Sequence, residues 1–396
     1  MQSTLASAGM QPDQLGPRLF DVGGLLARLR GLTDRRHPKG KRYSLAILLL
    51  LIALAKLSNE DSPGGIADWV SARAQAIKDA LGLAWPRMPH HNTYRRLFEN
   101  MVDPDEFDKT VSEHLQGLPG VGWSIVISID GKTVRGTIST SNPTGEHLLA
   151  AYLPQEGIVL MQVKAGNHDN EITAAPKLLK CLDLRGKVVI GDAMQAQREL
   201  SVQVLAGGGD YLWIVKDNQP TLREDIERLF APDRPTVLGG MVPNDFEHAR
   251  TVDKGHGRLE VREITVSSLL KGYSDWPGQE QVFKVERSRT RLKTSESSKE
   301  VVYGVTSIDR GRASPGQLLA MVRGYWGIEC GLHGRRDVTF KEDRTRLTRG
   351  QAGRVMATIN NLVIGLLRHS GATNLAQARR RYNADLSLPL SLLFAS

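Results

Sequence analysis

The sequence predicts an α/β fold: a mixed sheet with flanking helices, preceded by an all-helical region and interrupted by a β-rich insertion. Apolar residues recur at helical spacing within 1–118, whereas strand-like and helical runs alternate in 119–220. Strand-like runs separated by polar segments fill 221–310. Apolar residues recur at helical spacing again in 311–372, where we expect the helices that complete the core. We expect a peripheral C-terminal tail in 373–396.

The composition is that of a globular protein with a basic surplus. The chain has 396 residues, of which 40% are hydrophobic and 24% charged, enough for a sizeable core and two or three domains. Its 52 basic and 43 acidic residues give a net charge of +9, which favours a polyanionic partner.

Cysteine content and hydropathy indicate the compartment. The two cysteines, Cys181 and Cys330, cannot build a disulfide framework or a thiolate zinc site, which suits a reducing cytoplasm. The first residues lack the pattern of a secretory signal. The most apolar run, 45–57, is too short to cross a bilayer and is expected to be a buried helix. We therefore expect a cytoplasmic protein with no membrane partner.

A basic loop separates the first two predicted helices. It runs from Asp34 to Arg42 and could bind phosphates, although an ordinary solvated loop would explain the same charges. Its candidate phosphate-binding residues are Arg35, Arg36, Lys39, Lys41 and Arg42.

The predicted core alternates strands with helices. The first three strands are joined by short turns and the later ones by helices, which predicts an antiparallel meander extended by parallel strands. The expected strands are 125–129, 148–153, 159–163, 188–190 and 211–215, and the expected helices are 172–182 and 197–206.

Three acidic residues form the candidate catalytic site. Asp130 and Asp192 each follow an apolar run that reads as a strand, and Glu329 lies far downstream on a predicted helix. Carboxylates at strand ends and on a later helix can converge on a pair of divalent metals, the arrangement used for displacement at phosphodiesters. Each aspartate taken singly is better explained as a turn residue after a strand, but finding both beside small residues, Gly131 and Ala193, weakens that explanation.

The predicted helix around Glu329 suggests a second function. Arg336 lies seven residues later on the same face, where its guanidinium could hold a phosphate oxygen, although an ordinary helix ion pair has the same spacing. Four glycines form a stripe away from Glu329, which either admits a close backbone or breaks the helix. These are Gly324, Gly327, Gly331 and Gly334.

Three other carboxylates compete with Glu329 for the third position. Glu342 and Asp343 lie in a segment of mixed charge, and Glu171 opens a helix, where an acid also satisfies the helix dipole. Glu329 is favoured over all three.

Several motifs follow one another along the chain. They are Asp34-Arg35-Arg36, Asp130-Gly131-Lys132-Thr133-Val134-Arg135-Gly136, Asn170-Glu171-Ile172, Gly191-Asp192-Ala193-Met194, Lys216-Asp217-Asn218-Gln219-Pro220, His256-Gly257-Arg258, Trp326-Gly327-Ile328-Glu329 and Asp337-Val338-Thr339-Phe340. Together, over about residues 25–369, they resemble the H-repeat-associated branch of bacterial insertion-sequence DDE transposases.

The resemblance implies a ribonuclease-H-like core, a helical N-terminal DNA-binding domain and a β-rich insertion before the third acid. It also implies that Asp130, Asp192 and Glu329 hold the metals. The chain departs from the family at Tyr325-Trp326, where His-Trp is usual, and at Leu332-His333-Gly334, where Leu-His-Trp is usual.

The expected activity is cleavage at the ends of a DNA element and joining of those ends to target DNA. Two Mg²⁺ ions, replaceable by Mn²⁺, would serve the reaction. The expected partners are the element's terminal repeats and target DNA, held by a homodimer or larger assembly, with no small-molecule substrate. A nuclease that does not join, or an inactive DNA-binding descendant, remain alternatives. Phosphates near the acids would be held by Lys132, Lys216, Asn218, Arg323 and Arg336.

Overall fold

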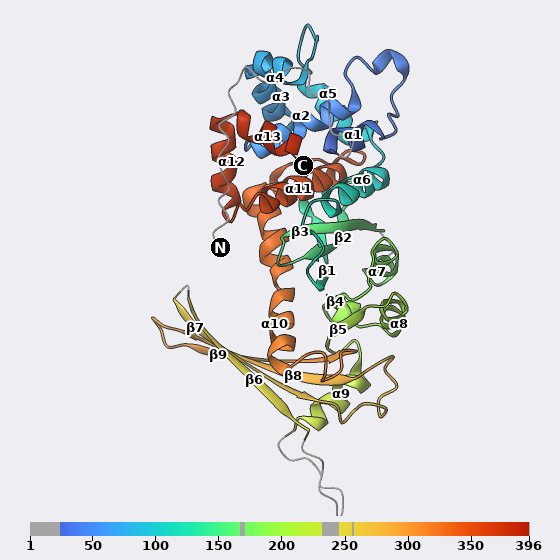
Figure 1. Cartoon of the computed structure of the whole chain (residues 1–396), viewed down its shortest axis with the longest axis vertical. Helices are drawn as coiled ribbons and strands as arrows, with labels where there is room; N and C mark the ends of the chain where they lie inside the picture. Colours follow the sequence, from blue (N-terminus) through green and yellow to red (C-terminus); the bar gives the residue numbers. More distant parts are fainter. Residues whose placement is uncertain (1–23, 167–170, 232–244, 256, 396) are drawn as a thin grey trace, which may run out of the picture.

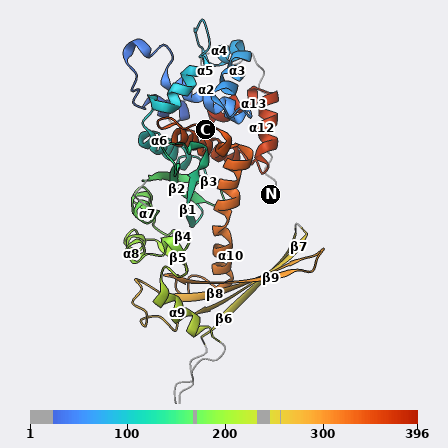
Figure 2. The same cartoon turned by 180° about the vertical axis from the view of Figure 1, so that it is seen from behind.

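The computed structural model of the protein describes residues 24–166, 171–231, 245–255 and 257–395. Asn170 and His256 of the motifs above, and the first 23 residues of the expected N-terminal domain, lie outside the described residues. The molecule is elongated: helices from both ends of the chain gather at one end, the core sheet lies in the middle, and the insertion forms the other end (Figure 1). The view from behind shows the same order (Figure 2).

The N-terminal region is helical, as its spacing predicts. α2 is buried along its whole length, because its thirteen residues are apolar on every side apart from Lys56. Asp103 caps α6 by accepting hydrogen bonds from two backbone N–H groups of the first turn. The helices are α1 (Leu25–Arg30), α2 (Leu45–Leu57), α3 (Pro63–Ala72), α4 (Ala74–Leu81), α5 (His91–Arg96) and α6 (Pro104–Gln116).

The core sheet has the strand order β3-β2-β1-β4-β5. β2 runs antiparallel to β1 and β3, while β4 and β5 continue parallel to β1. This order and these directions are those of a ribonuclease-H-like core, so the expected fold class is confirmed. The strands are β1 (Val126–Val134), β2 (Glu146–Leu153), β3 (Ile158–Ala165), β4 (Val188–Gly191) and β5 (Asp210–Val215).

Helices cover both faces of this sheet. Residues of α7 (Glu171–Leu179) and α8 (Arg198–Ala206) form one core with Ile127 and Val189. On the other face, α10 (Pro315–Tyr325) and α11 (Ala352–His369) pack with the N-terminal helices. A buried network joins β3, α6 and α11, since Gln162 donates to both Asp108 and Thr358, which are bonded to each other.

The insertion continues the core sheet. After α9 (Pro220–Leu229) the chain forms four strands, and the last of these, β9, pairs antiparallel with β5 through Leu212 opposite Thr306. Within the described residues, one sheet of nine strands results, in the order β3-β2-β1-β4-β5-β9-β8-β7-β6. The added strands are β6 (Glu247–Gly255), β7 (Arg258–Ser267), β8 (Gln281–Arg291) and β9 (Ser297–Thr306).

The prediction that residues 373–396 form a peripheral tail is wrong. The C-terminal residues form α12 (Leu375–Ala384) and α13 (Ser387–Ala395), which lie among the N-terminal helices (Figure 1). The reason is Arg379, which is fully buried and donates hydrogen bonds to the backbone carbonyls of Lys56 and Thr339 and to the Asp61 carboxylate. Polar groups buried between helices need such a partner.

Candidate active site

Strand pairing places Asp130 and Asp192 side by side. Ser128 of β1 lies opposite Ile190 of the parallel strand β4, so each aspartate stands two residues further along its own strand. Asp130 does not end its strand as expected, because β2 keeps pairing with β1 as far as Val134. β4 does end, at Gly191, and Asp192 then accepts a hydrogen bond from the Met194 N–H at 2.9 Å.

Glu329 reaches the same place from a helix with widened turns. α10 ends at Tyr325, and the chain continues through two π-helical segments, η6 (Glu329–His333) and η7 (Arg335–Thr339). Such turns are frequent at functional sites. Ligand atoms of Asp130, Glu329 and His333 all lie within 4.8 Å of one another.

The glycine stripe lets this segment lie directly on the end of β2. A Cβ added at Gly331 would come within 2.7 Å of the Tyr152 hydroxyl, and one at Gly327 within 3.3 Å of Pro154 Cβ. The first distance is shorter than real Cβ contacts, so alanine at 331 would push the helix away from the sheet. Both outcomes expected for these glycines are therefore found in part: Gly327 and Gly331 allow a close approach to side chains of the sheet, and the regular helix ends among the glycines, at Tyr325.

Negative charge accumulates at Asp130. Burial, followed by the charges of Glu329, Glu171 and Asp192, raises the pKa of the Asp130 carboxyl to about 8. Burial and Glu171 also raise the pKa of Asp192. Among the described residues, no side chain or backbone group forms a hydrogen bond with the buried Asp130 Oδ2. The described residues therefore place several carboxylates around Asp130 and too few cations to neutralise them.

Two further groups face Asp130, and sequence reasoning missed both. The Tyr325 hydroxyl lies 3.5 Å from Asp130 Oδ1, and burial with the neighbouring acids raises the pKa of that phenol. His333 Nδ1 lies 3.5 Å from Asp130 Oδ2 and 3.9 Å from Glu329 Oε2. The sequence carried a signal for His333, because residues four apart on a helix share a face.

The rival acid Glu171 lies close by but has its own partners. One of its oxygens is 2.9 Å from His147 Nε2, and the other accepts a hydrogen bond from Gln195 Nε2 at 3.0 Å. Its carboxylate rests against the Cα of Gly131, where an added Cβ would come within 2.0 Å of it. Glu171 thus adds negative charge to the site while its own oxygens are bound elsewhere.

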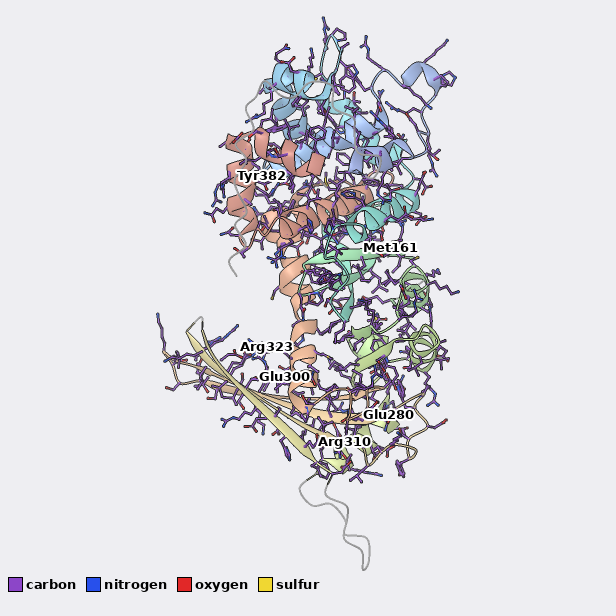
Figure 3. All side chains as sticks on the ribbon, viewed as in Figure 1. Met161, Glu280, Glu300, Arg310, Arg323 and Tyr382 are labelled. Carbon is purple, nitrogen blue, oxygen red and sulfur yellow. The ribbon has the colours of Figure 1, made fainter. Side chains whose placement is uncertain are left out.

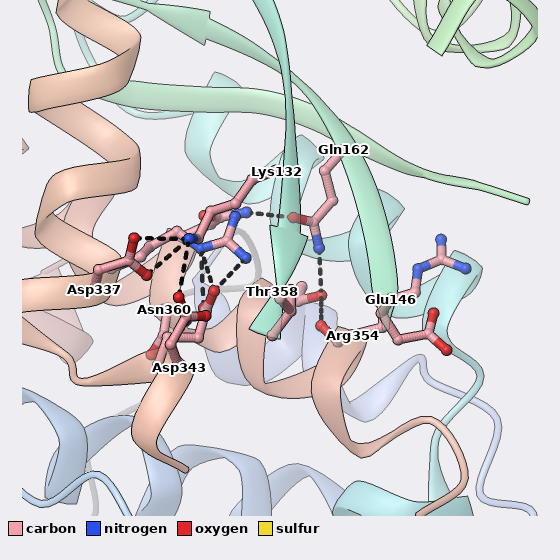
Figure 4. Close-up of polar contacts among 12 residues, drawn as sticks. Lys132, Glu146, Gln162, Asp337, Asp343, Arg354, Thr358 and Asn360 are labelled. Atoms are coloured by element: carbon pink, nitrogen blue, oxygen red, sulfur yellow. Dashed lines mark hydrogen bonds and ion pairs between the residues drawn. The ribbon is translucent and has the colours of Figure 1, made fainter. Parts of the chain in front are cut away.

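Lys132 and Arg336 do not offer free cations for phosphates, which corrects their expected role. Lys132 is buried and contacts Asp337 at 2.7 Å and Asp343 at 3.9 Å (Figure 4). The Arg336 guanidinium is also buried, and its Nε lies 2.9 Å from both Glu342 oxygens. The rivals Glu342 and Asp343 are accordingly partners of internal cations.

Two of the predicted DNA-binding residues lie beside the acids and one lies apart. Lys216 is exposed just after β5, and its charge offsets part of the rise that burial and Glu171 cause in the pKa of Asp192. Asn218 donates a hydrogen bond to the backbone carbonyl of Ala193, next to Asp192. Arg323, labelled in Figure 3, projects from α10 toward the insertion and pairs with Asp253 of β6 at 3.0 Å.

The basic loop before α2 is far from the acids, at the helical end of the molecule (Figure 1). Arg36 turns inward, which corrects its expected role: its guanidinium binds Asp34 and the backbone carbonyl of Tyr43. Arg35 is half exposed and pairs with Asp103. Lys39, Lys41 and Arg42 are also exposed on this loop.

Comparison with known proteins decides the family. Residues 124–366 match the family described as "Transposase DDE domain", and residues 26–115 match the one described as "DDE_Tnp_1-associated". The chain belongs to the DDE transposase family. The first match contains Asp130, Asp192 and Glu329, together with the whole insertion.

Relatives of this transposase come from Escherichia coli. The protein named "H repeat-associated putative transposase YhhI", from strain K12, is 27% identical, with 88% of this chain and 91% of that protein aligned. "Putative transposase YncI", from O157:H7, is 29% identical over 88% of both chains. The first of these names agrees with the H-repeat-associated branch that the motifs indicate.

A solved structure aligns over most of the chain. It is the cryo-EM structure of a piggyBac transposase synaptic complex with hairpin DNA, with a TM-score of 0.44 and 12% identity, covering 93% of this chain and 78% of that one.

Among the described residues, every helix of the transposase is too short or too polar to span a bilayer.

Proposed function

We propose that this transposase cuts DNA strands at the ends of its element and joins them to target DNA, using Asp130, Asp192 and Glu329 as its catalytic carboxylates. The observation that supports this most directly is Asp130 Oδ2, a buried carboxylate oxygen without a hydrogen-bond partner among the described residues. It faces further acids, and an unpaired buried charge is costly unless something positive binds it.

A divalent cation fits this arrangement. Asp130 would hold it together with Glu329 on one side and share a second cation with Asp192 on the other. Oxygen ligands of this kind suit Mg²⁺ and Mn²⁺. The bound cations would polarise the phosphodiester and stabilise the attacking and leaving oxygens.

The chain's own residues would orient the acids and the DNA. The Met194 N–H holds Asp192 Oδ1, and the other oxygen of this carboxylate would bind the cation. The Tyr325 hydroxyl faces the Oδ1 of Asp130 and limits how far that carboxylate can rotate. Lys216, exposed beside Asp192, would bind a phosphate near the scissile bond without reading sequence.

DNA away from the acids would contact the helical end. Lys39, Lys41 and Arg42 are exposed together on the loop before α2, where three cations can bind successive phosphates. Both ends of an element must be held at once, so a dimer or larger assembly would form on DNA. Sedimentation of the protein with and without end DNA tests that assembly.

The test compares Asp192→Asn with Asp183→Asn, an exposed aspartate paired with Arg185 after α7. Both purified variants are incubated with labelled element-end DNA and Mg²⁺ beside the wild type. We expect Asp192→Asn to bind the ends but yield neither nicks nor joined products, while Asp183→Asn behaves as wild type.

The products separate the alternatives. Nicks without joined strands in the wild type would indicate a nuclease, and end binding without nicks would indicate an inactive descendant. Unchanged cleavage by Asp192→Asn would refute the assignment of the site.

A further inference from the structure

We infer that His333 is a ligand, beside Asp130 and Glu329, of one divalent cation in this site, and that this cation position therefore favours Mn²⁺ over Mg²⁺. The inference rests on the proposed function, because it concerns the same acids. It adds a nitrogen donor to a set described so far by its three carboxylates.

The distances match a shared cation. In an octahedral site with bonds of about 2.1 Å, adjacent ligand atoms lie about 3 Å apart and opposite ones about 4.2 Å apart. His333 Nδ1 is 3.5 Å from Asp130 Oδ2 and 3.9 Å from Glu329 Oε2, both within that range. The Asp130 and Glu329 ligand atoms lie within 4.8 Å of each other, so one ion can contact the ring and both carboxylates after small side-chain movements.

A hydrogen bond does not explain the same geometry. An N–H donor and a carboxylate oxygen lie about 2.7–3.2 Å apart when bonded, which is shorter than either distance. The imidazole is buried, at 6% exposure, and its Nε2 has no hydrogen-bond partner among the described residues. Nδ1, not Nε2, is the ring atom that faces the two carboxylates, and a cation between them would bind Nδ1 and both oxygens together.

The secondary structure supports the role. Glu329 and His333 are the first and last residues of η6, four positions apart, so one stretch of helix presents both toward Asp130. Gly331, between them, lets that helix rest against Tyr152. Helical spacing of an acid and a histidine is a common way to supply two ligands to one metal.

The nitrogen donor gives the cation position its preference. Mn²⁺ accepts imidazole nitrogen as well as oxygen ligands, although it is the weakest binder among the first-row transition ions, whereas Mg²⁺ demands oxygen ligands, so this position should discriminate between the two ions. Asp192 does not belong to the group of ligand atoms that Asp130, Glu329 and His333 form within 4.8 Å. A second cation held by Asp130 and Asp192 would have oxygen ligands and no such preference.

The experiment measures Mn²⁺ on the full-length protein without DNA. Mn²⁺ is titrated and the free ion followed by electron paramagnetic resonance, and electron spin-echo modulation of the bound ion is recorded for nitrogen coupling. The variants are His333→Ala and His333→Gln, with His248→Ala, an exposed histidine of β6, as the matched control. Mg²⁺ affinity is measured by competition in each.

We expect nitrogen modulation in the wild type and in His248→Ala, and its loss in both His333 variants. Mn²⁺ affinity should fall by about tenfold or more in those variants, the scale seen when the surroundings of a metal ligand are altered, while Mg²⁺ affinity changes less. If the His333 variants fail to fold, ¹⁵N-histidine labelling of the wild type must change the modulation pattern instead.

The outcomes separate the two proposals. Mn²⁺ bound without nitrogen coupling, in a wild-type protein that still cuts DNA, would overturn the role of His333 and leave the proposed function standing. A wild-type protein that binds neither ion and cuts no DNA would overturn both.

Discussion

Arg379 holds three parts of the chain together, and its removal gives a prediction that can be worked from the contacts. The guanidinium donates to the Lys56 carbonyl at 2.8 Å, the Thr339 carbonyl at 2.6 Å and the Asp61 carboxylate at 2.7 Å. It also lies 4.1 Å from the centre of the Phe340 ring. It thus connects α12 to α2 and to the end of η7.

The magnitude follows from what Arg379→Ala leaves behind. Asp61 keeps a cation, because Lys56 Nζ remains 3.1 Å away, so no carboxylate is orphaned. Two buried carbonyls lose hydrogen bonds to a charged donor, each worth about 1.5–3 kcal/mol. The cation–π contact adds about 1 kcal/mol, and water entering the space returns part of the loss. We expect a net destabilisation of about 4 kcal/mol.

Urea unfolding of Arg379→Ala, Arg379→Lys and the neighbouring exposed Arg380→Ala provides the measurement. Arg380→Ala should change the free energy of unfolding by less than about 0.5 kcal/mol. Arg379→Lys keeps the charge but not the fork of donors, so it should fall between the other two. A loss below about 1 kcal/mol for Arg379→Ala would show that these contacts do not hold α12 in place.

Two further predictions concern buried charge. Glu342→Gln should destabilise the protein by about 3–5 kcal/mol, because it leaves the charge of the buried Arg336 guanidinium uncompensated, and replacing both residues by leucine should recover most of that loss. Thermal unfolding measures the loss, with the exposed Glu199→Gln as the control. Equal stabilities of the Glu342→Gln and Glu199→Gln variants would contradict the prediction. Burial lowers the pKa of His114 from 6.5 to about 4, so the unfolded chain binds a proton that the folded chain refuses, and stability should fall by about 3 kcal/mol as the pH drops from about 6.5 to about 4. The drop should be visibly smaller in His114→Gln, and identical pH profiles of unfolding for the two proteins would count against this explanation.

The sequence predicted the elements of the core well because their patterns are local. Alternating and continuous apolar runs mark β1, β4 and β5, and the uninterrupted apolar run of α2 marks a helix buried on every side. The ribonuclease-H-like fold class followed from the motifs and is confirmed by the strand order.

What escaped prediction depends on contacts between distant residues. Lys132 and Asp337 are 205 positions apart, and only the folded chain reveals that they neutralise each other. Arg336 was expected to face phosphates, but its partner Glu342 lies beyond the end of η7, where helical spacing gives no guidance. The tail was misjudged for the same reason, since Arg379 finds its partners more than 300 positions earlier in the chain.

His333 is a different case, because its spacing from Glu329 does carry a signal: residues four apart on a helix share a face. What the spacing does not give is where that face lies relative to Asp130, which depends on how the helical segment packs against Tyr152 of the sheet.

The pairing of β9 with β5 determines where the insertion tolerates a change in length. Its hydrogen bonds run without a break from the core into the insertion, so one residue added within Tyr303–Thr306 would turn every following side chain to the opposite face of the sheet. The turns at Gly257 and Ser295, both with positive φ, lie at the free ends of the hairpins, where an added residue leaves that register untouched. In this chain, a change in length at these outer turns would therefore leave the pairing of β9 with β5, and the positions of Asp130, Asp192 and Glu329 relative to it, unchanged.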